Sequence, residues 1–173
     1  MARLTDLFDV DRLRLSSGEG RKLDLEVAIE PLGLGGQRYE IPGGRVPVRL
    51  DVSRTTGSGH ALRIAFEAAP SGPCMRCLEP AALALEIEAR EVSVPGGGEE
   101  LESPYVRDGV LDLRAWVRDA LALAMPAQPL CRPDCAGLCP VCGVDLNAAG
   151  AEHRHDREPD PRWAKLSELR FDA

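Results

Sequence analysis

Alternating hydrophobic and polar residues fill much of the first hundred positions of the chain. A period of two is typical of strands that bury one face of a sheet. Three stretches show it in the order of the chain, at 23–29, 46–52 and 62–66. The segment 55–59, rich in Thr, Ser and Gly, separates the second stretch from the third. This spacing predicts a β-hairpin.

The fourth predicted strand contains a change of phase. Hydrophobic residues alternate on one face over 83–89, whereas Val92 and Val94 fall on the opposite count. A β-bulge at Arg90–Glu91 is the simplest interpretation. Together the strands predict an antiparallel β meander, curled into a small open barrel or sandwich.

The hydrophobic period changes after residue 112 to that of an amphipathic helix. Asp112 is placed to cap its N-terminus, and Pro126 is placed to stop it. A second, shorter helix is predicted to begin at Asp160–Pro161. The hydrophobic positions of the first helix are Leu113, Trp116, Val117, Ala120, Leu121 and Ala124, and those of the second are Trp163, Leu166 and Leu169. The predicted fold class is therefore α+β, with one amphipathic helix beside the meander.

The length of 173 residues and the 44% of hydrophobic residues suit one domain with a modest appendage. We expect one composite domain. Its first part, 1–126, is a β-rich core with the amphipathic helix. Its second part, 127–173, is a cysteine-rich, zinc-binding segment with the tail helix.

The compartment decides how the six cysteines are interpreted. The first residues lack the apolar core of a signal peptide, and no apolar run reaches the roughly 18 residues of a membrane helix. We therefore expect a cytoplasmic protein without membrane contact, in which cysteines serve as metal ligands or reactive thiols. The net charge of −7 argues against binding nucleic acid by simple phosphate neutralisation.

The sequence Cys139-Pro-Val-Cys142-Gly143 has the form of a zinc knuckle. A Cys-x-x-Cys turn directs two thiolates at one ion, and structural zinc requires four sulfur or nitrogen ligands. Glycine after the second cysteine permits the positive φ that points backbone N–H groups at sulfur. His153 and His155 follow at a workable distance and predict a Cys₂His₂ site. The alternative is that both histidines lie on a solvated, charged tail.

Cys74 and Cys77 form another Cys-x-x-Cys pair, which combines most economically with Cys131 and Cys135. Such a Cys₄ site would join the end of the sheet to the segment that leaves the helix. The rival arrangement joins Cys74 and Cys77 to the knuckle cysteines and leaves the other pair without a role. Two zinc ions are predicted, and one is possible.

The sequence gives little support to an enzyme. Cys74-x-x-Cys77 is followed by Leu-Glu-Pro and a strand, whereas a thioredoxin-like centre opens a helix. The glycine run 96–98 lacks the Lys-Ser/Thr of a phosphate-binding loop. His60 begins a strand and is expected to be exposed. We predict no catalytic residues, no enzymatic activity and no small-molecule substrate.

These motifs together resemble the YceD family, also called DUF177. Three runs carry the resemblance: Cys74-Met-Arg-Cys77-Leu-Glu-Pro80, the segment from Cys131 to Asn147, and Asp160-Pro-Arg-Trp-Ala-Lys-Leu166. The similarity covers roughly residues 20 to 170. It implies a factor for the synthesis, processing or stability of 23S rRNA in large ribosomal subunit biogenesis. The implied partner is that RNA, a ribosomal protein or a pre-ribosomal particle.

The chain departs from the family pattern at one place. Fuller members carry a Cys-x-Cys pair where this chain has His153 and His155. Histidine can replace cysteine on zinc, so the position of the two histidines agrees with ligation. Two histidines in place of two cysteines make the second site neutral. The alternative to a ribosomal role is a zinc-ribbon adaptor between proteins, with transcription as one setting.

Overall fold

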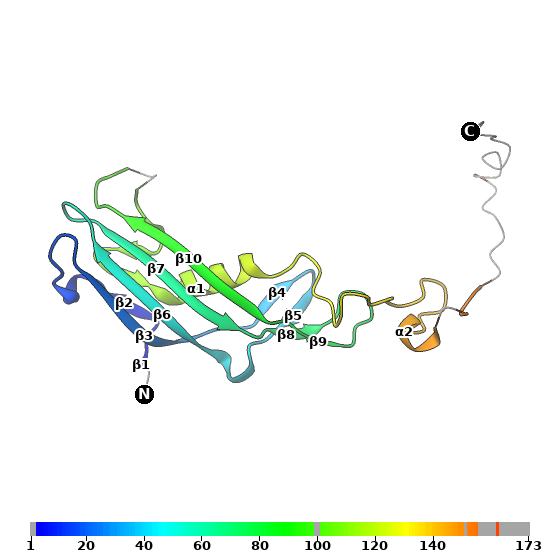
Figure 1. Cartoon of the computed structure of the whole chain (residues 1–173). Coiled ribbons are helices and arrows are strands. Elements are labelled where there is room, and N and C mark those ends of the chain that lie inside the picture. Colours follow the sequence, from blue (N-terminus) through cyan, green and yellow to red (C-terminus); the bar gives the residue numbers. More distant parts are fainter. Residues whose placement is uncertain (1–2, 99–100, 151, 156–161, 163–173) are drawn as a thin grey trace.

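The computed structural model describes residues 3–98, 101–150, 152–155 and 162. The described chain is elongated, with a sheet and helix at one end and a cysteine-rich segment at the other (Figure 1). The architecture is α+β, as predicted, with mostly antiparallel sheets and one main helix.

The main sheet has five strands in the order β1-β3-β6-β7-β10. Four of them pair antiparallel with their sequence neighbours in the sheet, which confirms the predicted meander. The loop 55–59 closes the β6–β7 hairpin, as predicted. The fifth strand, β1, adds to β3 in parallel. The strands are β1 (Arg3–Leu4), β3 (Gly20–Ala28), β6 (Arg45–Arg54), β7 (His60–Ala68) and β10 (Leu85–Ser93).

Three smaller sheets complete the strand pairing of the described residues. The first joins β2 (Leu7–Asp9), β11 (Val106–Arg107) and β12 (Val110–Asp112). The others are the hairpins of β4 (Leu32–Leu34) with β5 (Gln37–Tyr39) and of β8 (Ser71–Pro73) with β9 (Pro80–Ala82). Short 3₁₀ turns lie at η1 (Asp11–Leu13) and η2 (Pro42–Gly44), and a short helix, α2 (Leu146–Ala149), follows the last cysteine.

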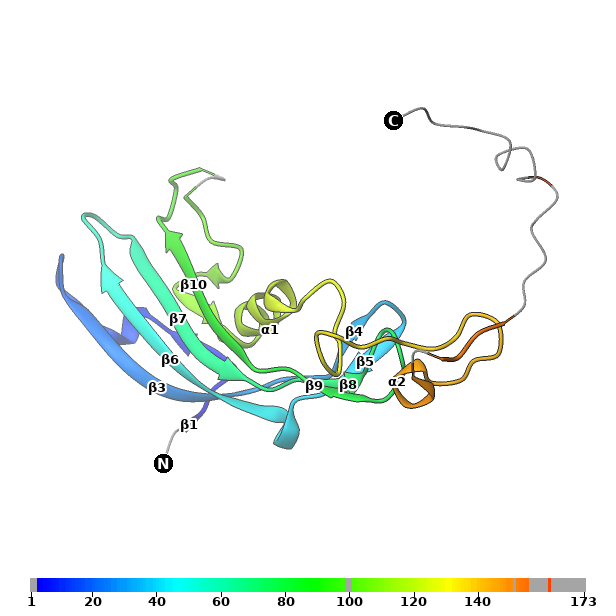
Figure 2. The same cartoon turned by 45° about the vertical axis from the view of Figure 1, so that its right-hand side comes forward.

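The core lies between the main sheet and α1 (Leu113–Ala124), which covers one face of the sheet (Figure 2). We call this face the inner face. Every second residue of each strand points to this face and is mostly hydrophobic. One example is the cross-strand row Leu23–Leu50–Ile64–Ala89. The hydrophobic stripe of α1, including Trp116 and Leu121, packs into the same core.

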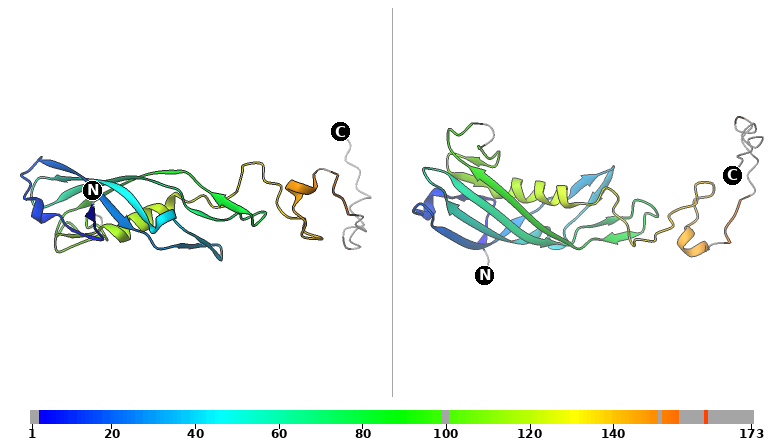
Figure 3. Two further views of the ribbon diagram at one scale, coloured as in Figure 1. Left: turned by 90° about the horizontal axis from the view of Figure 1, so that it is seen from below. Right: turned by 45° about the horizontal axis from the view of Figure 1, so that its top comes forward.

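The two ends of α1 follow the sequence signals. The side chain of Asp112 accepts a hydrogen bond from the backbone N–H of Ala115 at 2.9 Å, the contact expected of an N-cap. The helix ends at Ala124, and Pro126 follows two residues later. The chain then runs beyond the end of the sheet, beside β8 and β9 (Figure 3). The cap and the stop thus place the segment after α1 beside the β8–β9 hairpin.

The bulge predicted in the fourth strand was wrong. The strand β10 pairs with β7 residue by residue from Leu85 to Ser93, so no bulge occurs at Arg90–Glu91. Val92 keeps the strand's parity and lies on the outer face, with 45% of its surface exposed. The sheet is curved but forms no closed barrel in the described chain, because β1 and β10 remain its two edges.

His60 is buried, which corrects the expectation that it is exposed. It shares the parity of Leu62 and Ile64 on β7 and therefore points to the inner face, with 5% of its surface exposed. Its Nε2 atom lies 3.1 Å from Arg54 Nη1 and 3.9 Å from Asp11 Oδ1. Burial lowers the pKa of His60, the Arg54 guanidinium lowers it further, and Asp11 partly opposes them.

This burial predicts acid sensitivity. Because the folded pKa of His60 lies below its unfolded value of about 6.5, the unfolded chain takes up the proton first as the pH falls. Stability should therefore decline on acidification below about pH 6.5, by at most about 1.4 kcal/mol per pH unit from this one proton.

Urea unfolding of the wild type and of His60→Gln at several pH values tests the expectation. The difference between the two slopes isolates His60 from other titrating groups. Equal slopes for the two proteins would contradict this role of the buried imidazole.

The predicted tail helix from Asp160 falls outside the described residues. Among the described helices, none is long and apolar enough to cross a membrane.

Candidate metal centres

Cys74 and Cys77 lie in the turn that connects β8 to β9. The backbone N–H of Cys74 donates to the carbonyl of Glu79, and that of Leu78 donates to the carbonyl of Cys74. Leu78 has a φ of 65°, the position at which a knuckle usually has glycine. The backbone N–H of Met75 donates to the carbonyl of Pro129, which brings the segment after α1 alongside this turn.

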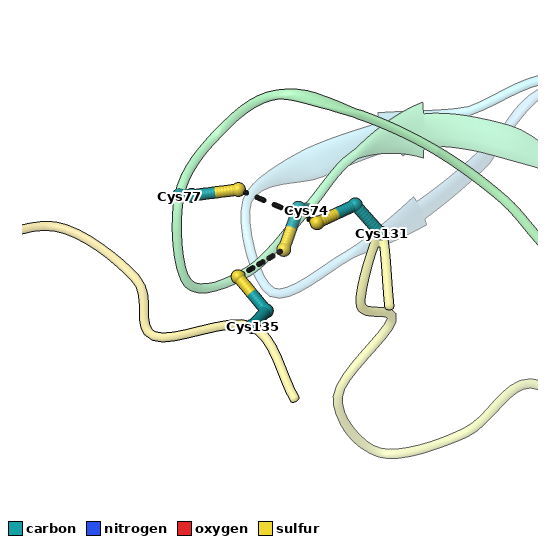
Figure 4. A group of neighbouring side chains, drawn as sticks. All are labelled: Cys74, Cys77, Cys131 and Cys135. Atoms are coloured by element: carbon teal, nitrogen blue, oxygen red, sulfur yellow. Dashed lines mark hydrogen bonds between the residues drawn. The ribbon is translucent and has the colours of Figure 1, made fainter. Parts of the chain in front are cut away.

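Cys131 and Cys135 on that segment meet the first pair of cysteines (Figure 4). The Sγ atoms of Cys74 and Cys135 are 3.8 Å apart, and those of Cys77 and Cys131 are 3.6 Å apart. All four sulfur atoms lie within 4.8 Å of one another. They form a largely buried cluster, with Ala81, Leu130 and Leu138 packed around it. We call this cluster the inner centre.

These distances test whether zinc fits. Zn–S bonds of about 2.3 Å in a tetrahedron place sulfur atoms about 3.8 Å apart. The two sulfur–sulfur distances of 3.6 Å and 3.8 Å agree with that edge. A disulfide bond requires about 2.05 Å, and the four thiols are free. The inner centre therefore has the dimensions of a tetrahedral thiolate site.

The charges of the inner centre also favour a cation. Burial raises the pKa of Cys74, but hydrogen bonds from backbone N–H groups, chiefly that of Cys77, outweigh it and lower the pKa to about 6. A backbone N–H from Glu79 lowers the pKa of Cys77, but burial and the neighbouring thiols raise it to about 12. One thiolate therefore forms readily and the next does not. A divalent metal ion would compensate the accumulated negative charge.

The second group of candidate ligands, the outer centre, is Cys139, Cys142, His153 and His155. Cys142 Sγ lies 3.4 Å from His153 Nε2, which in turn lies 2.9 Å from His155 Nε2. Gly143 has the predicted positive φ, at 74°. Backbone N–H groups of Cys142 and Val141 lower the pKa of Cys139 to about 6.

The outer centre is more accessible than the inner one. Cys142 and His155 are exposed, His153 is half-buried, and only Cys139 is buried. The structure thus groups the eight predicted ligands as the two-site hypothesis does, and not in the rival arrangement. That each group binds a metal ion remains a prediction.

Asn147 ties the segment after the knuckle to the inner centre, a role that the sequence patterns did not reveal. Its Nδ2 donates to Cys135 Sγ at 3.6 Å, and its Oδ1 accepts from the backbone N–H of Ala136 at 2.8 Å. Asp145 holds the amide in place through a 2.7 Å hydrogen bond and caps α2. The only sequence signal was the position of Asn147 at the end of the knuckle motif.

The fold and the two centres define a class: α+β proteins in which a strand-to-strand turn and the chain beyond the main helix together offer two groups of four potential metal ligands. More particularly, the chain belongs to the YceD family, described as "Large ribosomal RNA subunit accumulation protein YceD", which matches residues 62–170. This match confirms the resemblance that the cysteine motifs suggested.

Relatives in mycobacteria extend the similarity to nearly the whole chain. An uncharacterized protein of Mycobacterium tuberculosis is 37% identical over 168 residues, covering 92% of this chain and 80% of the relative. An uncharacterized protein of Mycobacterium leprae is 33% identical over 170 residues, covering 94% of this chain and 76% of the relative. No solved structure gives a significant match.

Proposed function

We propose that this chain is a non-catalytic, zinc-stabilised factor that supports the synthesis, processing or stability of 23S rRNA in large ribosomal subunit biogenesis. Family membership carries the proposal, because the family description names the accumulation of large-subunit ribosomal RNA. The matched region, 62–170, contains every candidate ligand of both centres.

The ligand sets support a structural role for the metal. Each centre offers four protein ligands, whereas catalytic zinc keeps one position for water or substrate. Sulfur and imidazole in a tetrahedral arrangement favour zinc over hard cations such as magnesium. Zinc in the inner centre would join the β8–β9 turn to the segment after α1 and so hold the two halves of the chain together.

Depletion of the protein from its host cells tests the ribosomal role. We expect a deficit of large subunits on sucrose gradients, with immature or missing 23S rRNA by RNA-end mapping. Re-expression of the wild type should restore the profile, and Cys74→Ser should not. Leu123→Ala serves as the matched control, because this α1 side chain is exposed.

Normal subunits in depleted cells that still grow poorly would overturn the ribosomal proposal. That outcome would favour the zinc-ribbon adaptor instead. Rescue by Cys74→Ser to the level of the wild type would show that the inner centre is dispensable for the cellular role.

A further inference from the structure

The outer face of the main sheet, opposite α1, is not covered by any helix of the described chain (Figure 2). Its residues alternate with the buried ones along β3, β6, β7 and β10. Most of them are exposed, including Asp24, Pro47, Glu67 and Glu86. A sheet face of this kind is available to a partner.

A depression of about 600 Å³ crosses this face over all four strands. Two short side chains, Pro47 and Ala65, lie between longer charged neighbours and leave the space open. The pairing of β6 with β7 ends at Val48–Phe66, so Pro47 lies where the two strands separate. The charged residues that line the depression are Asp24, Arg49, Glu67, Glu86 and Glu88, four carboxylates against one guanidinium.

A second depression, of about 280 Å³, continues the first towards the cysteine-rich end. Half of its six lining residues are alanines, namely Ala68, Ala69 and Ala84. The two depressions share Glu67 and Glu86. Together they form one trough, with this pair of carboxylates between its two hollows.

The charge of that pair is not balanced within the described chain. Glu67 and Glu86 are directly opposite each other on β7 and β10, an arrangement that destabilises a sheet when the charges are alike. Neither forms an ion pair with a described residue, whereas Glu88 on the same face pairs with Arg63 and Arg90. Glu67 and Glu86 therefore lack the arginine partners that Glu88 has.

We infer that the trough docks an extended, basic segment of a partner protein. An arginine or lysine of that segment lies between Glu67 and Glu86, and its small neighbours occupy the two hollows. Charge complementarity identifies this occupant, since the carboxylates repel the phosphates of RNA. The chemistry of this partner follows from the trough alone, and only its cellular role rests on the proposed function.

The test is binding of a fluorescent peptide of alternating arginine and alanine, measured by anisotropy at low and moderate salt. Alternation places the arginines on one face of an extended chain. Glu67→Gln/Glu86→Gln should weaken binding about tenfold. The matched control, Glu19→Gln/Glu102→Gln, changes the net charge equally but lies outside the trough, and should weaken binding less than about twofold.

The stability of the same variants excludes unfolding as the cause of weaker peptide binding. Removing two opposed carboxylates relieves repulsion, so the trough variant should be at least as stable to urea as the wild type. Equal loss of binding in both variants, no loss in either, or preferential binding of a single-stranded RNA oligonucleotide would each overturn the inference. The peptide assay uses the purified full chain, so its outcome is independent of the depletion experiment.

Discussion

Replacement of Cys74 by serine is expected to empty the inner centre of metal and to unfold the segment after α1. Cys74 is fully buried, and its sulfur lies 3.8 Å from that of Cys135. Loss of one thiolate leaves only three ligands in the centre, too few to retain the ion, whose binding contributes about 10–16 kcal/mol in small zinc domains. We expect the free energy of unfolding to fall by more than about 5 kcal/mol.

Elemental analysis and limited proteolysis measure this effect. The wild type is expected to hold two zinc ions, and Cys74→Ser should lose at least the inner one and become sensitive to protease after Met125. Cys142→Ser is the matched control, since this thiol is exposed in the outer centre. It should lose one ion with a much smaller change in stability. Full zinc content in Cys74→Ser would contradict the assignment of the inner centre.

The strands that the sequence predicted best are those with a regular parity. Leu50 and Ile64 fall in alternating runs, and the structure pairs them in the same row of the core. His60 shares the parity of Leu62, so the alternating pattern itself indicates that His60 is buried. Its position beside a turn favoured the opposite prediction. Parity therefore carried more information than residue type at the strand end.

Hydrophobicity is a poor guide to burial at the end of the fourth strand. The predicted bulge would turn Val92 towards the same face as the preceding hydrophobic residues, yet Val92 is exposed, while the neighbouring Ser93 is buried. A single exposed valine on an edge strand costs little stability, whereas a bulge would interrupt the hydrogen bonds between β7 and β10. The unbroken register is the simpler arrangement.

The candidate centres show a different limit. Cys-x-x-Cys spacing predicts local turns, so both knuckles could be anticipated from four residues each. Which turn meets which is a long-range property, set by contacts such as that of Met75 with Pro129. The contacts of Asn147 with Cys135 and Ala136 depend on the same packing, so no periodicity in the sequence could have revealed them.

Truncation of Trp116 to alanine is expected to cost about 3–5 kcal/mol, out of a total stability of about 5–15 kcal/mol. Trp116 is 2% exposed on α1, and its ring stacks on Tyr105 with centroids 6.0 Å apart. Its loss leaves a cavity beneath the helix, between it and the inner face of the sheet. Leu123→Ala, on the same helix at 86% exposure, should change stability by less than about 0.5 kcal/mol.

Urea unfolding followed by circular dichroism, with zinc release read by a chromogenic indicator, separates two outcomes for Trp116→Ala. If 1–126 and 127–173 form one composite domain, zinc release and loss of the sheet signal should shift together to lower urea. If the centres hold together on their own, zinc release should keep its wild-type midpoint while the sheet unfolds earlier. A midpoint for Trp116→Ala equal to that of Leu123→Ala would contradict the packing of α1 on the sheet, because only a buried side chain leaves a cavity when it is truncated.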